Sequence, residues 1–164
     1  MRSRIVLGLV LAFSLLAIPN QAIASKRTVV GPENQRLTAS QTTRLMDSQT
    51  VKISGTAYNK KVGIYLAFCE MPKPGSLPTN CAGGMDLSGE SPSSFWISSN
   101  PPEYAVGLTK PFSSRGGFIV NLRVSRFIGK VDCALKKCAI LTRADHTRSA
   151  YRKADVVIPV SFTK

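Results

Sequence analysis

The chain has 164 residues, 43% hydrophobic and 19% charged, which is enough apolar sequence for one hydrophobic core but not for a multidomain enzyme. Its 22 Lys and Arg residues against 9 Asp and Glu residues give a formal net charge of +13, which favours contact with polyanions without indicating a fold. Twelve glycines and ten prolines favour a turn-rich β protein over a helical bundle or a disordered chain.

Residues 1–24 have the pattern of a secretory signal peptide. Two arginines precede an apolar run at residues 5–18, and a small-residue sequence at residues 22–24 follows it. The run is shorter than the roughly 20 apolar residues of a transmembrane helix, so an uncleaved anchor is the alternative that we favour less. Cleavage after Ala24 predicts a secreted or envelope-associated protein with no membrane span.

The next segment, residues 25–36, combines basic residues with glycine and proline and shows little hydrophobic periodicity. We expect a flexible basic leader here, and we expect the folded domain to cover residues 37–164.

Short runs of alternating apolar residues then predict half-buried β-strands, for example at residues 64–68, 118–124 and 156–162. Turn signals that contain Gly, Asn or Asp separate these runs, and no helical stripe stands out. Many short antiparallel strands in one domain predict an all-β fold, an immunoglobulin-like β-sandwich.

Residues 82–110 depart from this rhythm. Two consecutive prolines at positions 101 and 102 exclude a central strand, so we expect a long central loop with one short edge strand at residues 95–98. Phe95 and Trp96 either plug the end of the core or form the wall of a pocket.

The four cysteines are Cys69, Cys81, Cys133 and Cys138. An even number in an exported protein predicts two disulfides. Three pairings are possible, and we prefer Cys69 with Cys81 and Cys133 with Cys138 because each pair is close in the chain. A zinc site is the alternative, but the spacings are not C-x-x-C and His146 is the only histidine, so we expect no metal.

We expect no catalytic site and no cofactor. Asp145 and His146 are adjacent, and adjacent side chains of an extended chain point to opposite faces, so they do not suit the base and orienting group that a nucleophile needs. Neither a G-x-S-x-G motif nor a phosphate-binding loop is present. A haem-binding role for His146 or Tyr151 is an alternative whose geometry no spacing defines.

Basic residues are dense toward the carboxyl end. They form either a solvated surface or a face that binds anionic cell-wall polymers by screened, sequence-independent attraction. Few aromatic residues lie among them, so we do not expect base-specific DNA recognition. The candidate polyanion-binding residues are Arg123, Arg126, Lys136, Lys137, Arg143, Arg148, Arg152 and Lys153.

Several segments, in the same order along the chain, resemble the neocarzinostatin family. Residues 45–57 (LMDSQTVKISGTA) resemble its opening GLSDGTxVxVxGxG sequence, and residues 65–69 resemble its third strand, which ends in the first cysteine. Residues 122–127 (LRVSRF) are similar to its LTVRRSF strand. Residues 131–138 share its D-C-x4-C spacing, and residues 159–162 resemble its last strand. The resemblance extends from about residue 37 to residue 162.

This resemblance implies a seven-stranded immunoglobulin-like sandwich with a small disulfide-stapled subdomain. It also implies a secreted actinobacterial apoprotein that is not an enzyme, carries an enediyne chromophore as an antibiotic and delivers it to DNA. By position, the Cys69–Cys81 disulfide would be the floor of the cleft, and Met71 replaces an aromatic residue. We therefore expect an apolar small molecule in a cleft lined by Cys69, Met71, Cys81, Phe95 and Trp96.

Overall fold

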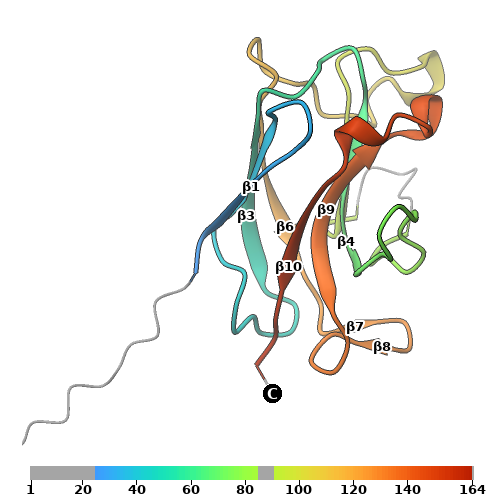
Figure 1. Ribbon diagram of the computed structural model, residues 1–164. Coiled ribbons are helices and arrows are strands. Elements are labelled where there is room, and N and C mark those ends of the chain that lie inside the picture. The colour runs from blue at the N-terminus through green and yellow to red at the C-terminus, as the bar shows by residue number, and fades with distance from the viewer. Residues whose placement is uncertain (1–24, 85–90, 164) are drawn as a thin grey trace, which may run out of the picture.

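Two antiparallel four-stranded sheets pack face to face to form a β-sandwich (Figure 1). The computed structural model describes residues 25–84 and 91–163, so the predicted signal peptide lies outside the described residues. No helix in the described part of the chain is long and apolar enough to cross a membrane.

The first sheet has the strand order β1-β2-β3-β6 and the second has the order β10-β9-β4-β5. A separate hairpin, β7-β8, lies at one end of the sandwich (Figure 1). The first sheet contains β1 (Arg27–Val30), β2 (Arg36–Ala39), β3 (Thr50–Thr56) and β6 (Phe118–Arg123). The second contains β4 (Ile64–Glu70), β5 (Ser94–Ile97), β9 (Cys138–Ala144) and β10 (Val156–Val160), and the hairpin is β7 (Phe127–Ile128) and β8 (Val131–Asp132). Short 3-10 helices are η1 (Glu103–Ala105), η2 (His146–Arg148) and η3 (Arg152–Ala154).

The core lies between the sheets because each strand turns alternate side chains inward. In β6 the buried and exposed positions alternate without exception, and Val120 and Leu122 pack into the core. The central strand β4 contributes Leu66 and Phe68, both fully buried. Gly55 of β3 leaves room for a core aromatic ring, since a Cβ atom there would lie 2.0 Å from the ring of Phe118.

The predicted all-β fold is confirmed, and so are both preferred disulfides, Cys69–Cys81 and Cys133–Cys138. The expectation of a flexible leader at residues 25–36 is wrong, because β1 pairs with β2 along its whole length. The side chains of this edge strand are mostly exposed, so its sequence lacks the apolar alternation that marks a strand. With β1 included, the described sandwich has eight strands rather than the seven expected.

The predicted short edge strand is confirmed as β5, which pairs with β4. Its outer side is covered by Lys110, which forms a parallel bridge with Ile97. The backbone N–H of Lys110 donates to the carbonyl of Trp96 at 2.9 Å, and the N–H of Ser98 donates to the carbonyl of Lys110 at 2.9 Å.

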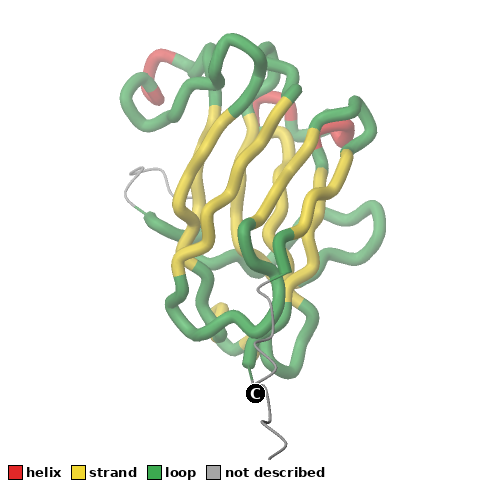
Figure 2. Tube along the Cα trace, turned by 90° about the vertical axis from the view of Figure 1, so that its left-hand side faces the viewer, coloured by secondary structure: helices red, strands yellow, loops and turns green. Residues whose placement is uncertain are grey.

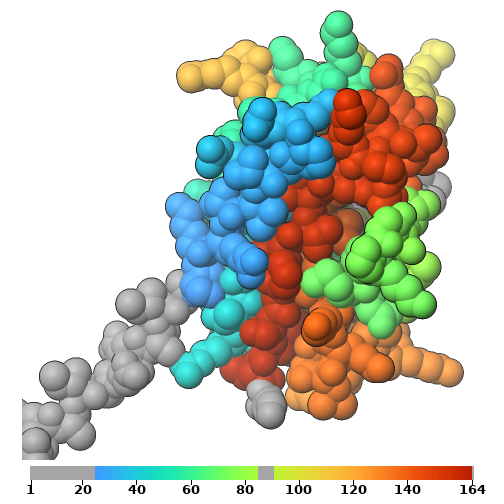
Figure 3. Space-filling view, in the orientation of Figure 1, coloured from blue at the N-terminus to red at the C-terminus, as the bar shows by residue number. Residues whose placement is uncertain are grey.

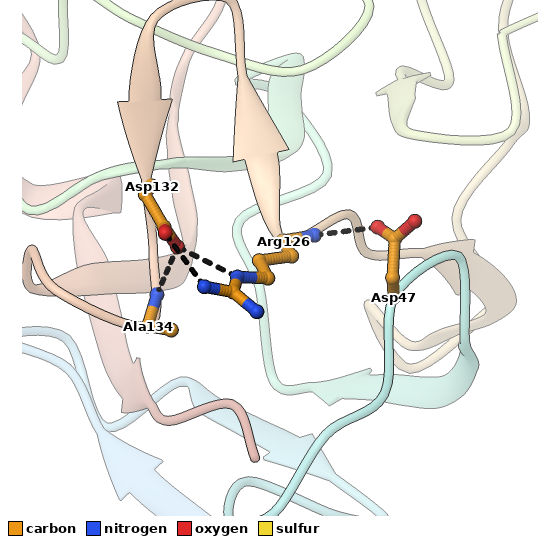
Figure 4. Close-up of polar contacts among 4 residues, drawn as sticks. All are labelled: Asp47, Arg126, Asp132 and Ala134. Carbon is orange, nitrogen blue, oxygen red and sulfur yellow. Dashed lines mark hydrogen bonds and ion pairs between the residues drawn. The ribbon is translucent and has the colours of Figure 1, made fainter. Parts of the chain in front are cut away.

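An ion pair closes the base of the β7-β8 hairpin, and Asp47 connects the hairpin to the sandwich (Figure 4). The guanidinium of Arg126 makes two hydrogen bonds to Asp132, at 2.9 Å through Nε and 2.8 Å through Nη2. The backbone N–H of Arg126 donates to Asp47 in the β2–β3 loop at 2.8 Å. The Arg126 guanidinium holds the pKa of Asp132 below its usual value, so the carboxylate stays charged over a wide pH range.

Candidate functional site

The candidate site is on the outer face of the second sheet. Tyr65, Ala67 and Cys69 project from β4 away from the core, because they alternate with the buried core residues of the same strand. Arg143 of β9 is directly opposite Tyr65, and Leu141 is opposite Ala67. These side chains form one surface across the centre of the sheet.

A proline-containing loop, residues 71–84, stands beside this surface (green in Figure 1). The Cys69–Cys81 disulfide closes the base of the loop. Next to it, the backbone N–H of Glu70 donates to the carbonyl of Asn80 at 2.8 Å. The loop is therefore anchored to β4 at both ends and forms a fixed wall over the sheet.

Two adjoining hollows separate the loop from the sheet. The first has a volume of about 210 Å³ and is walled by the outward-facing rings of Tyr65 and Trp96 over an apolar floor. The second, about 280 Å³, lies between the loop and strands β9 and β10, and Figure 3 shows the molecule hollowed there. Both are lined by Pro78, Leu141 and Arg143, so they are two parts of one cleft. Together they reach the size of small-molecule sites, which is roughly 300–1,000 Å³.

Trp96 is held in a fixed orientation at one end of this cleft. Its indole Nε1–H donates to Asp145 Oδ2 at 2.9 Å, and the Trp96 side chain is 5% exposed. Asp145 is itself buried and also accepts a hydrogen bond from the Thr147 hydroxyl at 2.6 Å. The Tyr65 ring packs against the indole with the ring centroids 5.6 Å apart. Hydrogen bonds and ring packing within the protein therefore hold this aromatic wall in place.

His146 connects two tyrosines at the same end of the cleft. The Tyr65 hydroxyl lies 2.5 Å from Nδ1 and the Tyr104 hydroxyl lies 2.5 Å from Nε2. Burial, together with the negative charge of Asp145, raises the pKa of Tyr65 to about 12, so its phenol is neutral at physiological pH. Asp145 and His146 thus have separate hydrogen-bond partners.

Arg143 is the cation shared by both hollows. Its Nε–H donates to the carbonyl of Ala144 at 3.3 Å, and the guanidinium has no other hydrogen-bond partner among residues 25–84 and 91–163. Asp155, in the second hollow, forms an ion pair with Arg152 at 2.6 Å, and its burial raises its pKa. The cleft thus combines apolar walls with one available guanidinium in its floor.

The structure brings together most of the predicted ligand-binding residues. Cys81, Phe95 and Trp96 line the first hollow, and Met71 lines the second. Cys69 is fully buried beneath the surface and supports the floor through its disulfide. Phe95 is opposite the core residue Leu66 and packs against the core, which agrees with the core-plugging alternative for this residue.

Sequence reasoning missed Tyr65 and Leu141, and it assigned Arg143 to polyanion binding rather than to the cleft. A signal for Tyr65 was present, because it is four residues before Cys69 in a predicted strand and so lies on the same face.

The eight candidate polyanion-binding residues do not share one face. Arg126 forms an ion pair with Asp132 (Figure 4), and Arg152 forms one with Asp155. Arg143 lies in the cleft. The others lie apart: Arg123 projects from β6 of the first sheet, Lys136 and Lys137 are in the β8–β9 loop, and Arg148 and Lys153 are in η2 and η3. The seven-residue strand β9 separates the last two groups by about 20 Å along its length.

Residues 37–162 match the sequence model of the neocarzinostatin family. Among solved structures, macromomycin superposes with a TM-score of 0.52 at 16% sequence identity, over 79% of this chain and 99% of that chain. This likeness shows a shared fold. A search of curated protein sequences gave no match.

Proposed function

This chain belongs to the neocarzinostatin family, and on that premise we propose that it is a secreted, non-catalytic protein that binds an apolar small molecule in the cleft of its second sheet. The observation that carries the proposal is the pair of adjoining hollows, the first of which is walled by the rings of Tyr65 and Trp96. Two disulfides and the signal-peptide pattern of residues 1–24 support secretion.

The cleft suits an aromatic or conjugated ligand. Tyr65 and Trp96 offer ring surfaces whose positions are already set by Asp145 and His146, so a ligand need not order them. The anchored loop keeps water from one side of the bound molecule. Sequestration of a reactive compound from solvent would follow from these walls without any chemical step by the protein.

The family resemblance extends to an enediyne as ligand and to DNA as its eventual target, but we do not propose either for this chain. Met71 replaces the aromatic residue that the family has after the first cysteine, and Tyr65 of β4 and Trp96 of β5 supply the aromatic wall instead. A wall built from different strands selects a ligand of different shape.

The test uses the single tryptophan of the chain. Native mass spectrometry of the oxidised protein from its producing organism should show a discrete adduct that denaturation removes, and rebinding of that compound should change the emission of Trp96. Ala67→Phe places a ring into the floor of the first hollow and should abolish binding. Leu77→Phe is the matched control, because Leu77 is 44% exposed and lines neither hollow.

Two results would count against the proposal. The first is a folded, fully oxidised protein with no adduct and with Trp96 emission unchanged by a panel of aromatic compounds. The second is equal binding by the Ala67→Phe variant and the parent protein, since this would place the ligand elsewhere.

A further inference from the structure

A second surface, unrelated to the cleft, covers the outer face of the first sheet. Its strands turn alternate side chains away from the core, and Figure 2 shows this sheet facing the viewer with no described segment crossing in front of it. We call this surface the outer face. Its polar members include the cations Arg36, Lys52 and Arg123 and the hydroxyl residues Thr28, Thr38 and Ser54.

The strand register arranges these side chains in rows. Thr28, Thr38 and Ser54 are in register across β1, β2 and β3, and the hydroxyls of Thr28 and Thr38 are 2.8 Å apart. Arg36 is opposite Thr56, and Arg123 is opposite Thr50. On the strand rise of about 3.4 Å per residue, the three cations are spread over about 20 Å along the strand direction, on both sides of the hydroxyl row.

Among residues 25–84 and 91–163, no carboxylate on the outer face neutralises these cations. The four strands have the sequences RTVV, RLTA, TVKISGT and FIVNLR, which contain no acidic residue. Neither ion pair among the described residues involves them. Two carboxylates lie in the adjoining turns, and both are engaged elsewhere: Glu33 accepts a hydrogen bond from the Tyr151 hydroxyl, and Asp47 accepts from Ser125 and from the backbone of Arg126.

The outer face also has no aromatic side chain, because the one aromatic residue of these strands, Phe118, is buried in the core. Single-stranded nucleic acid binding relies on aromatic side chains that stack on bases, so this surface lacks a main contact for DNA or RNA. Its exposed apolar residues, Val30 and Ile119, are aliphatic and suit contact with carbon chains.

We propose that the outer face binds a linear phosphate polymer without bases, such as a polyol-phosphate chain, along the direction of its strands. Arg36, Lys52 and Arg123 bind the phosphates, and the Thr and Ser hydroxyls donate hydrogen bonds to them. This site does not depend on the proposed small-molecule cleft, because the two surfaces are on opposite sheets of the sandwich.

The test measures binding of inorganic polyphosphate to the oxidised protein over a range of salt concentrations. The face variant, Arg36→Gln/Lys52→Gln/Arg123→Gln, is compared with a control variant of equal charge, Lys136→Gln/Lys137→Gln/Arg148→Gln. All six side chains are exposed, so both variants should fold. Circular dichroism and the denaturant midpoint check this.

In the parent protein, log K for polyphosphate binding should fall linearly with log salt concentration, with a slope of about 0.7 for each phosphate contact. The face variant loses three contacts, so we expect the magnitude of its slope to be smaller by about 2. The control variant should retain the slope of the parent. Equal losses in the two variants would show attraction to net charge alone and would overturn the proposal. Absence of binding by the parent protein would also overturn it. So would tighter, face-dependent binding of single-stranded DNA than of polyphosphate.

Discussion

Removal of each disulfide in turn tests how the loops of this protein are stabilised. Cys69 and Cys81 are separated by 12 residues in the chain, and Cys133 and Cys138 by 5. The entropy of closing loops of these lengths in the unfolded chain predicts a loss of about 3 kcal/mol for the first disulfide and about 2 kcal/mol for the second. The larger loop should therefore matter more.

The assays are equilibrium unfolding in urea, for the free energy, and thermal unfolding, for the melting temperature, of two double variants, Cys69→Ala/Cys81→Ala and Cys133→Ala/Cys138→Ala. At about 2–4 °C per kcal/mol for a chain of this size, the melting temperature should fall by about 6–12 °C in the first variant and about 4–8 °C in the second. The first variant should also change the emission of Trp96, because it releases one wall of the first hollow. A larger loss in the Cys133/Cys138 variant would refute the loop-length reasoning, and unchanged Trp96 emission in the first variant would show that the disulfide does not hold the wall.

Three further changes test charge and backbone geometry. Arg126→Gln should make the stability of the protein less sensitive to acid. The lowered pKa of Asp132 contributes stability that is present above pH 3.8 and is lost as the pH falls further. Urea midpoints measured across acidic pH should therefore decline less steeply in the variant. The raised pKa of Tyr65, about 12, contributes stability that is present below pH 10 and is lost as the pH rises through 12. Tyr65→Phe should therefore reduce the loss of stability at alkaline pH, measured by urea midpoints. An unchanged loss would contradict the raised pKa of Tyr65. Gly116→Ala should cost more than Gly107→Ala in urea unfolding: both have positive φ, +70° and +90°, but a Cβ at Gly116 would lie 2.1 Å from a carbonyl oxygen and one at Gly107 would meet nothing within 4 Å.

The fold could be predicted where one face of a strand is buried. The segment 118–124 alternates apolar and polar residues because β6 packs one side on the core, and such a pattern is visible in a single sequence. The edge strand β1 buries little, so its pairing with β2 has no counterpart in its hydrophobic pattern. The disulfide pairing could be predicted because the partner cysteines are close in the chain.

The candidate site could be predicted only in part, because it depends on register between distant strands. Cys81, Phe95 and Trp96 were identified from the disulfide position and from the unusual central loop. Tyr65 and Arg143 are 78 positions apart and meet only because β4 and β9 pair with these two residues opposite each other. Local sequence does not determine such a register. Similarly, the basic residues between Arg123 and Lys153 are close in the chain, but β9 separates them into groups at its two ends. Two of them, Arg126 and Arg152, are neutralised by ion pairs with nearby carboxylates.

The bridge between Ile97 and Lys110 has a consequence for the protein at high concentration. An exposed edge strand offers unpaired N–H and C=O groups to a second chain and so promotes aggregation. At β5 the backbone of Lys110 already pairs with the carbonyl of Trp96 and the N–H of Ser98, and its ammonium lies 5.8 Å from the centre of the Phe95 ring. The Lys110 segment therefore opposes the addition of a strand from a second molecule at this edge of the sheet.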